Sequence, residues 1–501
     1  MEGRRVTEHN TNYIPLTNGD PGRHHRGLPR MQMSTFRLFR HYIPTAFIFL
    51  GMIEAVVFLL SFHAAVFIRF SNDSAVIGEL IGPLWPKSIV FALVMMLSMI
   101  GLGLYVRSSW SWEGRSAMFL RVLACFVFAI FPLSFVFYVA PELSVWRGPA
   151  LLSLVVSLVG IISVRLIFFG VVDQELFKRR VLVLGAGKNA CEIRKLEGKP
   201  ALHGISVVGY AHMSRDHDVV ENERVINPDC PLRDVVREHQ VDEIVVALDD
   251  RRKSLPVHEL LDCKMDGVRV FDLLTFFERE TGKIRLELVH PSWLFLSDGF
   301  RTSNVSLVLK RSLDILISLL FLPLFLPVML IVVVAIWLES PSESPILYKQ
   351  TRVGSGDKEF LIYKFRSMRA NAEENGLAQW AKKHDARVTR VGAIIRKIRL
   401  DELPQLFNVI KGDMSFVGPR PERPEFVKQL VEQYPYYRER HRMRPGLTGW
   451  AQIRYEYGDT FEDAFEKLQY DLYYVKNSSI FLDLLIIIHT VEVILMGKGA
   501  H

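Results

Sequence analysis

The sequence predicts a membrane protein that consists of a four-span α-helical bundle, a Rossmann-like α/β domain, and a mainly α-helical domain with a re-entrant membrane helix. Half of the 501 residues are hydrophobic, and the mean hydropathy is +0.18, which is rare for a soluble protein of this size. Four long apolar runs come before a region in which short strands alternate with helices. A fifth apolar run carries two prolines in its middle.

The N-terminal part of the chain holds a polar tail and the first four apolar runs. Residues 1–41 are polar and rich in arginine, so we expect a disordered tail. Residues 42–172 hold four stretches that approach or exceed the ~20 residues of a transmembrane helix. We expect helices because backbone groups in lipid must pair within their own segment. The stretches are 42–68, 88–106, 117–140 and 148–172.

Basic residues that flank these stretches predict the orientation of the chain. The tail carries seven arginines against three acids, and the fourth stretch is followed by Lys178, Arg179 and Arg180. Lysine and arginine accumulate on the cytoplasmic side of a bilayer. We therefore expect the tail and everything after residue 173 to lie in the cytoplasm.

Few ionisable residues lie within the apolar stretches. A charge inside a membrane marks either a contact or a functional site. No second acid accompanies Glu54, so we interpret it as a contact between helices. Arg121 and Arg165 lie near the ends of their stretches, where long side chains can extend to the membrane surface.

Net charge and cysteine content narrow the classes of function. A net charge of +7 suits nucleic acid, anionic lipid or phosphate-bearing substrates, and the apolar runs favour lipid over nucleic acid. The four cysteines include no C-x-x-C pair, and the closest two, Cys230 and Cys263, are 33 residues apart. We therefore expect neither a zinc site nor a disulfide framework.

Residues 173–300 show the pattern of an α/β domain with a parallel sheet. Short apolar strands at 180–184, 205–210 and 243–248 alternate with helical segments, one of them at 231–239. The first strand runs into Gly185-Ala186-Gly187 and a helix, which matches G-x-G-x-x-A and is able to hold a pyrophosphate. The acid that a nicotinamide site places after the second strand is missing, so a structural or regulatory module is favoured over a cofactor site.

A linker and the fifth apolar run occupy residues 301–340. The run at 313–338 is long enough to span, but Pro323 and Pro327 favour a bend, and basic residues lie on both of its sides. A helix that enters the membrane, bends at Pro327 and returns fits better than an ordinary fifth span, which stays the alternative. The C-terminal run at 479–496 is short and contains charges, so we expect an interfacial helix.

The chemistry-bearing residues gather in the last part of the chain, 341–501. Arg396 precedes the adjacent acids Asp401 and Glu402, and Arg420 lies between two prolines. Phosphoryl transfer needs cations around the phosphorus and an aligned nucleophile, and a carboxylate is able to serve as that nucleophile. Mg²⁺ and guanidinium groups would neutralise the anionic substrate. The cluster therefore predicts a phosphoryl-transfer site.

Six motifs give residues 310–501 a resemblance to the polyprenyl-phosphate phosphoglycosyl transferases of the monotopic, bacterial sugar transferase type. The motifs are KR-x-x-D at 310–314, QTRVG at 350–354, YKFRSM at 363–368, LDELPQLFNVIKGDMSFVGPRP at 400–421, RPGLTGWAQ at 444–452 and YYVKN at 473–477. The four spans and the Rossmann-like module resemble the large members of that family, which start exopolysaccharide or O-antigen repeat units in the bacterial inner membrane.

The resemblance implies a role for each matching residue. Asp401 matches the nucleophile and a Mg²⁺ ligand, and Glu402 matches the dyad partner that positions or deprotonates the acceptor phosphate. Pro327 matches the proline that breaks the re-entrant helix, although Leu326 stands where the family has serine. The phosphate-binding positions are Lys364, Arg396 and Arg420. The nucleotide-binding positions are Arg444, Pro445, Gly446, Thr448 and Gln452.

The resemblance also implies the reaction and the partners. A UDP-sugar would give its sugar 1-phosphate to Asp401 with release of UMP, and undecaprenyl phosphate would then take it, in a homodimeric enzyme. Two other readings stay open. A membrane-tethered nucleotide-sugar dehydratase or epimerase would need a Tyr-x-x-x-Lys pair, which residues 179–300 lack. A non-enzymatic scaffold for polysaccharide assembly would release no UMP.

Overall fold

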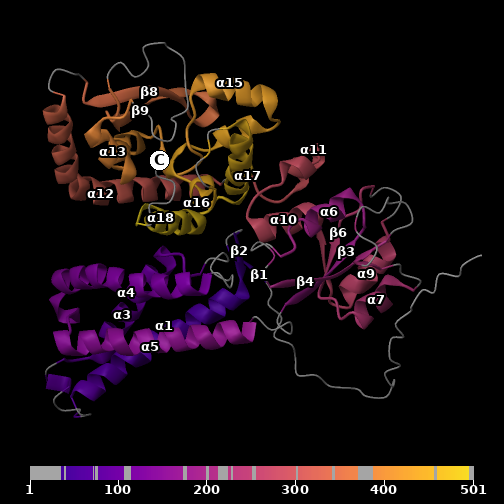
Figure 1. The fold of residues 1–501 in the computed structure, drawn as a ribbon, viewed down its shortest axis with the longest axis horizontal. Coiled ribbons are helices and arrows are strands. Elements are labelled where there is room, and N and C mark those ends of the chain that lie inside the picture. Colours follow the sequence, from indigo (N-terminus) through magenta and orange to yellow (C-terminus); the bar gives the residue numbers. More distant parts are fainter. Residues whose placement is uncertain are drawn as a thin grey trace, which may run out of the picture.

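The fold was obtained as a computed structural model, and it forms a helical bundle, an α/β domain and a C-terminal domain (Figure 1). The structure describes residues 35–38, 41–70, 73, 77–79, 81–105, 114–172, 178–198, 202, 204–212, 220, 224–226, 230–250, 255–300, 303–340, 345–369, 387–455, 458 and 460–495. In Figure 1 the α/β domain lies to one side of the other two parts.

The N-terminal bundle is built from four apolar helices, which agree with the four predicted stretches to within a few residues. They are α1 (Thr45–Arg69), α3 (Leu84–Gly101), α4 (Gly114–Val139) and α5 (Arg147–Val172), with the short helix η2 (Pro141–Leu143) before α5. All four contain a segment that is long and apolar enough to cross a membrane, and so does a fifth helix, α12 (Asn304–Glu339). These helices fit a membrane protein.

A buried ion pair joins two of these helices. Arg165 donates from Nε to Oε1 of Glu54 at 2.6 Å, and both side chains are almost fully buried. The Tyr105 hydroxyl also donates to Glu54. The prediction of a helix–helix contact at Glu54 is confirmed, whereas the expectation that Arg165 extends to the membrane surface is wrong, because a buried carboxylate is the better partner.

The end of the expected disordered tail is ordered. Strands β1 (Thr35–Leu38) and β2 (His41–Pro44) pair as an antiparallel hairpin directly before α1. The prediction of a disordered tail up to residue 41 is therefore wrong for this stretch. Aromatic and β-branched residues at Phe36, Tyr42 and Ile43 favour strands there, and the remainder of the predicted tail lies outside the described residues.

The α/β domain contains a five-stranded parallel sheet, which confirms the predicted alternation of strands and helices. Its order is β5 (Val225–Ile226), β4 (Ile205–Ala211), β3 (Arg179–Leu184), β6 (Glu243–Val246) and β7 (Arg269–Asp272). The helices are α6 (Lys188–Arg194), α7 (Leu232–Glu238), α9 (Val257–Met265) and α10 (Leu273–Thr281). One buried apolar cluster covers each side of the sheet.

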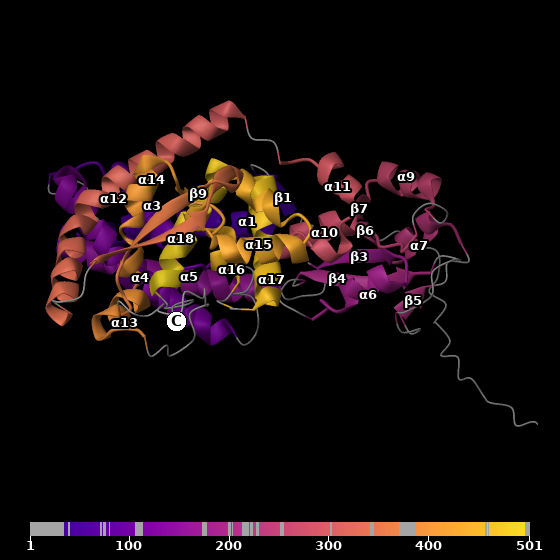
Figure 2. The same cartoon turned by 90° about the horizontal axis from the view of Figure 1, so that it is seen from above.

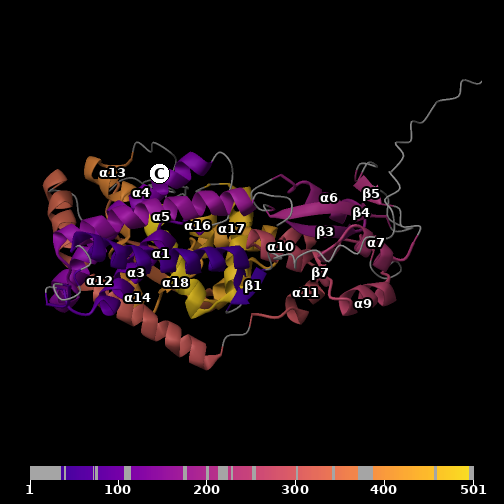
Figure 3. The same cartoon turned by 90° about the horizontal axis from the view of Figure 1, so that it is seen from below.

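Helix α12 follows this domain and is the first element of the C-terminal domain. The short helices η6 (Leu286–Leu288) and α11 (Pro291–Leu296) precede it. Both Pro323 and Pro327 lie inside α12, which continues through them. Figures 2 and 3 show α12 as two limbs that meet at a bend. Proline removes a helical hydrogen bond and clashes with the preceding turn, so a bend is the expected result.

The C-terminal domain, which we define as the described residues 304–495, surrounds one large apolar core. Its strands are β8 (Leu347–Val353), β9 (Glu359–Phe365), β10 (Ser415–Val417) and β11 (Gly446–Thr448). Its helices after α12 are η7 (Ser355–Asp357), α13 (Arg390–Lys397), η8 (Leu400–Glu402), α14 (Gln405–Lys411), α15 (Pro424–Gln433), η9 (Tyr437–Arg442), α16 (Trp450–Arg454), α17 (Phe461–Asn477) and α18 (Ile480–Leu495).

Helix α18 is the segment that the sequence predicts to lie at the membrane interface. The structure confirms a helix there and shows what covers it. Leu482 and Ile486 are fully buried in the C-terminal core, while Ile488 lies beside Gly101 at the end of α3. The helix therefore packs between the core of its own domain and the helical bundle.

Candidate active site

Two adjacent acids, Asp401 and Glu402, lie where the chain turns from α13 into α14. The turn begins at Arg399, which adopts a left-handed backbone conformation with φ of 56°, and continues as the single 3₁₀ turn η8. The side chain of Glu402 is buried, and that of Asp401 is half-buried. Both acids therefore precede the regular part of α14. Adjacent side chains in a regular helix point about 100° apart, so this position outside the helix suits two acids that face one site.

Two cations hold Glu402 in place. Arg420 donates from Nη2 to Oε1 of Glu402 at 2.6 Å, and Lys364 donates from Nζ to the same oxygen at 3.2 Å. Burial on its own would raise the pKa of Glu402, but Arg420 and Lys364 outweigh it and hold that pKa well below its usual range. Glu402 is therefore a fixed carboxylate whose charge is already balanced.

Asp401 differs from Glu402 in its contacts and in the direction of its pKa shift. Within the part of the chain that the structure describes, no hydrogen bond or ion pair engages its carboxylate. Burial, and after it the charge of Glu402, raise the pKa of Asp401 to about 6. The charges of Lys364 and Arg396 act in the opposite direction. Asp401 is thus the carboxylate of the pair that is available to a substrate.

The flanking elements hold Lys364 and Arg396 beside this pair. Asn408 of α14 donates from Nδ2 to the carbonyl of Leu361 and accepts at Oδ1 from the backbone N–H of Tyr363, so it holds strand β9 next to the acids. Arg396 is half-buried in the last turn of α13, five residues before Asp401. The structure therefore brings Lys364, Arg396 and Arg420 together around Asp401 and Glu402, as predicted from the sequence.

The backbone around Arg420 is fixed at three successive carbonyls. Pro419 accepts from the N–H of Gly446 at 3.0 Å, Arg420 accepts from Nη2 of Arg440 at 2.8 Å, and Pro421 accepts from Nη1 of Arg352 at 3.3 Å. Because these carbonyls are held, the Arg420 side chain extends to Glu402 from a fixed position of the backbone. Arginine at a rigid position suits a planar, bidentate contact with phosphate.

The RPGLTGWAQ segment packs tightly against the segment that carries Arg420. Strands β10 and β11 pair in parallel, and a Cβ atom added at Gly446 would lie 2.1 Å from the nitrogen of Gly418. Side chains larger than hydrogen would therefore force the two segments apart. This close approach places the predicted nucleotide segment directly beside Arg420.

The predicted nucleotide-binding residues face different surroundings. Arg444 is exposed, whereas Pro445 and Gly446 are buried in the pairing with β10. The Thr448 hydroxyl lies 2.7 Å from the hydroxyl of Thr490 in α18. Oε1 of Gln452 is buried and has no hydrogen-bond partner among the described residues. Arg444 and Gln452 are thus the two polar side chains of the set that remain open to a ligand.

The acid pair fits a Mg²⁺ ion that is shared with a substrate. The described residues include no group of three or more His, Cys, Asp or Glu that could hold a metal by itself. Mg²⁺ commonly takes only one or two carboxylates and completes its shell with substrate phosphates and water. Asp401 supplies an unengaged carboxylate, so the predicted ligand is compatible with that kind of site.

The glycine-rich turn of the α/β domain is filled by a side chain of its own domain. The carboxylate of Asp249 accepts the backbone N–H groups of Lys188 and Asn189, both at 2.9 Å. A Cβ atom added at Gly187 would lie 2.3 Å from Oδ2 of Asp249. A pyrophosphate would need these same N–H groups. This arrangement favours the predicted structural module over a cofactor site, and it weighs against a dehydratase or epimerase.

Two residues that hold strand β10 in position, Lys310 and Asp314, were not identified as site residues from the sequence. Lys310 donates from Nζ to Asp483 at 2.8 Å and to the carbonyl of Val417 at 2.9 Å, and Asp314 accepts from Ser415 and from the N–H of Phe416. Both therefore hold β10, which leads to Arg420. Residues four apart share one face of a helix, so the KR-x-x-D spacing contained this signal.

Comparisons with known proteins show which family the chain resembles. Residues 305–497 match the family model described as bacterial sugar transferase. A glucose-1-phosphate transferase acting on UDP-glucose and undecaprenyl phosphate from Xanthomonas campestris is 30% identical over 442 residues, which cover 84% of this chain and 89% of the relative. The corresponding protein of Escherichia coli is 33% identical over 65% of this chain and 69% of the relative.

A third relative carries a different sugar in its name. The UDP-N-acetylgalactosamine-undecaprenyl-phosphate N-acetylgalactosaminephosphotransferase of Aeromonas hydrophila is 45% identical over 242 residues. That match covers 48% of this chain and 56% of the relative, so it spans little more than half of that protein. The near full-length match to the Xanthomonas protein, together with the family model, shows that this chain belongs to the bacterial sugar transferase family.

Proposed function

We propose that the protein transfers a sugar 1-phosphate from a UDP-sugar to undecaprenyl phosphate through a covalent phosphosugar on Asp401. The observation that carries this proposal is the contrast within the acid pair: two cations hold Glu402, while Asp401 has no partner among the described residues. A nucleophile has to be free to attack, whereas a positioning group has to be held. The names of the relatives support the acceptor and the type of reaction.

In the first step, an oxygen of Asp401 attacks the phosphorus that carries the sugar. A new bond forms between that oxygen and phosphorus, the bond from phosphorus to the UMP oxygen breaks, and UMP leaves with the electron pair. Arg420, Lys364 and Arg396 lie around the acid pair, where their positive charges offset those of the diphosphate. A Mg²⁺ bound at Asp401 would add a further positive charge against the phosphate oxygens.

In the second step, a phosphate oxygen of undecaprenyl phosphate attacks the phosphorus of the acyl phosphate. The bond between phosphorus and Asp401 breaks, which restores the carboxylate and leaves a lipid diphosphate sugar. Glu402 is a weak base, because Arg420 and Lys364 hold its pKa well below the usual range. We therefore assign Glu402 to the positioning of these two cations, in preference to deprotonation of the acceptor.

The donor is proposed to be a UDP-hexose or a UDP-N-acetylhexosamine. Of the three relatives described above, two are named for glucose and one for N-acetylgalactosamine, so relatives of both kinds exist. The product would be the first lipid-linked intermediate of an extracellular polysaccharide repeat unit, as implied by the resemblance. The sugar itself is decided by a panel of donors in the assay described below.

We further propose that α12 is re-entrant and that the N- and C-terminal regions lie in the cytoplasm. Near its start, Arg311 donates to the carbonyls of Val409 and Ile410 at the end of α14, both at 2.6 Å. Its last residue, Glu339, accepts from the N–H groups of Arg390 and Val391 at the start of α13. A straight helix would separate Arg311 from Glu339 by about 42 Å.

Both ends of α12 thus contact the same domain and flank the turn that carries the acids. Only 17% of the most apolar window of α12 is buried within the protein, which leaves the remaining apolar surface for lipid. A helix whose two ends contact the same part of its domain has to return to the side from which it entered. If α1, α3, α4 and α5 are four full spans and the N-terminal region is cytoplasmic, as proposed, then the acid pair lies at the inner face of a bacterial cytoplasmic membrane.

The proposal is tested by UMP release from the purified full-length protein. The assay combines a panel of UDP-sugars with undecaprenyl phosphate and Mg²⁺. We expect UMP release with at least one donor and a loss of about 10⁴-fold or more in Asp401→Asn, since the nucleophile is gone. Glu425→Gln removes an exposed carboxylate of the same domain and should keep its activity. Absence of UMP release with every donor, or full activity of Asp401→Asn, would contradict the proposal.

A further inference from the structure

We infer that Glu278, which lies in the α/β domain outside the sugar transferase region, is a positioning residue for the active-site Arg420. This inference rests on the proposed function, because its test reads the rate of UMP release. Glu278 lies in α10 and contacts α17 of the C-terminal domain, and α17 in turn holds the backbone of Arg420. The α/β domain thereby braces a site whose acid pair and Arg420 lie in the C-terminal domain.

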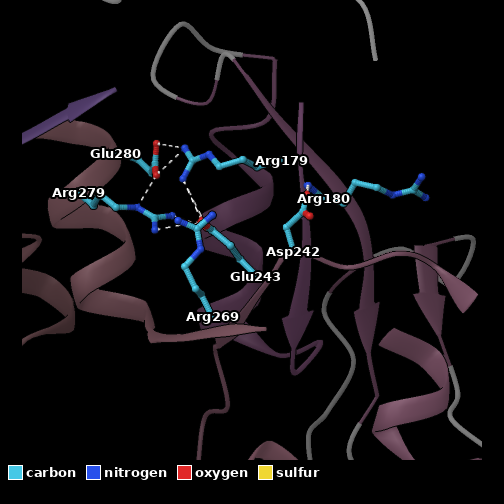
Figure 4. A network of polar contacts seen from close by, with 7 residues as sticks. All are labelled: Arg179, Arg180, Asp242, Glu243, Arg269, Arg279 and Glu280. Atoms are coloured by element: carbon cyan, nitrogen blue, oxygen red, sulfur yellow. Dashed lines mark hydrogen bonds and ion pairs between the residues drawn. The ribbon is translucent and has the colours of Figure 1, made fainter. Parts of the chain in front are cut away.

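Helix α10 is fixed to the sheet of its own domain by a buried network of charges (Figure 4). Arg279 pairs with Glu243 at 2.6 Å, and Arg179 pairs with Glu280 at 2.9 Å. Arg179 also contacts Glu243 at 3.2 Å, and Arg269 adds a third cation to that carboxylate at 2.8 Å. Such a network resists distortion, because separating Arg179 or Arg279 from its carboxylate partners leaves a charge buried without a partner.

The residue that precedes this network reaches into the C-terminal domain. Glu278 accepts from Nζ of Lys476 at 2.6 Å and from Nδ2 of Asn477 at 2.8 Å. All three side chains are at least 95% buried. Lys476 also lies 4.0 Å from the ring centre of Trp293, so its charge is enclosed on more than one side. The conspicuous Lys-Asn pair of the YYVKN motif therefore faces the α/β domain and not the acid pair.

Three further contacts extend the same interface towards the RPGLTGWAQ segment. The indole N–H of Trp450 donates to the carbonyl of Gly282 at 2.8 Å, directly after α10. The N–H of Ile284 donates to the carbonyl of Gln469 in α17 at 3.1 Å. Trp450 stacks on Tyr473 of α17, with ring centres 5.7 Å apart. The end of α10 thus touches both α17 and the segment that packs against Arg420.

Helix α17 completes the connection to the acid pair. Asp471 pairs with Arg440 at 2.8 Å, and both side chains are buried. Arg440 donates to the carbonyl of Arg420 at 2.8 Å, and the Arg420 side chain donates to Glu402 at 2.6 Å. A shift at the end of α17 would therefore change the orientation of the Arg420 side chain. Displacement of a catalytic group by about 1 Å can cost about 100-fold in rate.

The variant Glu278→Ala tests the inference because it leaves Lys476 buried without its carboxylate. We expect the rate constant of UMP release to fall about 10- to 100-fold. Adding Lys476→Met to this variant removes the unpaired charge and should return the rate to within about threefold of wild type. The matched control is Glu466→Ala, which removes a partly exposed partner of Lys283 at the same interface and should change the rate less than about twofold.

A positioning role is separated from general destabilisation by repeating the change in an Arg420→Ala background. If Glu278 acts through Arg420, then Glu278→Ala should cause little further loss there, since the group it positions is absent. A full additional loss in that background, or a wild-type rate in Glu278→Ala itself, would overturn the inference. Should Glu278→Ala fail to fold, the same comparison is made with Glu278→Gln, which keeps the shape of the side chain and removes only the charge that pairs with Lys476. Failure of the proposed function is distinct, because the wild-type protein would then release no UMP.

Discussion

Arg420 and Glu402 are joined by a 2.6 Å contact between Nη2 and Oε1, and this contact separates the roles of two neighbouring acids. It occupies the carboxylate of Glu402, whereas that of Asp401 has no partner in the described part of the chain. Because Arg440, Arg352 and Gly446 hold the backbone on both sides of Arg420, the guanidinium reaches Glu402 from a fixed position. The unequal surroundings of the two acids underlie the predictions below.

The first prediction concerns the shape of the Arg420 side chain. Arg420→Lys keeps the positive charge but loses the planar fork, so we expect kcat/KM to fall about 10- to 100-fold. The measurement is steady-state UMP release over a range of donor concentrations. Arg438→Ala removes an exposed arginine nearby and serves as the control. A lysine variant as active as wild type would show that charge alone is sufficient.

The pH dependence of the first step follows from Asp401. Burial, and then the charge of Glu402, raise the pKa of Asp401 to about 6. Attack needs the carboxylate, so the rate of UMP release should fall about tenfold per pH unit below about pH 6. The raised pKa also means that ionisation of Asp401 lowers folding stability as the pH rises from about 4 through about 6.

Added Mg²⁺ provides a control for this pH prediction. A cation bound at Asp401 favours the ionised carboxylate, so higher Mg²⁺ should move the acid limb of the profile to lower pH. The measurement is the pre-steady-state rate of UMP release at several Mg²⁺ concentrations. A profile that stays flat between about pH 5 and 7 at low Mg²⁺ would contradict the assignment of this limb to Asp401.

The buried pair of Glu54 and Arg165 predicts a stability effect within the bundle. Removing one partner leaves a buried charge, so Glu54→Ala should lower stability by about 3–5 kcal/mol. The double variant Glu54→Leu/Arg165→Leu removes both charges and should be milder. Thermal unfolding of the detergent-solubilised protein measures both effects, with the exposed Glu142→Ala as control. Equal losses in the single and double variants would argue against the pair as the cause.

The carboxylate of Asp249 predicts that the α/β domain does not take up a dinucleotide at its glycine-rich turn. We expect no change in the thermal unfolding of the full-length protein with NAD⁺ or NADP⁺. Asp249→Ala should instead lower stability by about 1–2 kcal/mol, because two N–H groups at the start of α6 lose their acceptor. A clear stabilisation of the wild type by a dinucleotide would contradict this account.

Hydropathy patterns over a few residues predicted most elements of the fold. The elements that were not predicted have local sequences that hide their apolar pattern. The four apolar helices of the bundle and strands such as β3 and β6 follow from hydropathy over a few residues. Strand β7 was missed because Arg269 and Asp272 make it polar. The hairpin before α1 was missed because basic residues such as Arg37 outweigh its short apolar pattern.

The candidate site was predictable only where its residues are neighbours in sequence or share a motif. Asp401, Glu402 and Arg396 lie within seven consecutive residues, and their predicted roles follow the family resemblance. Lys310 and Asp483 are 173 residues apart, so their contact exists only in the folded chain. Glu278 belongs to no motif and becomes visible through its burial against Lys476.

The covalent intermediate on Asp401 is tested most directly by mass spectrometry of the protein after mixing with its UDP-sugar and Mg²⁺ in the absence of undecaprenyl phosphate. We predict a mass increase equal to one sugar phosphate, mapped to the peptide that contains residue 401, and its loss when the lipid acceptor is added. Asp401→Asn should show no increase. Turnover by the wild-type protein with no such adduct, or an adduct on another residue, would contradict this account.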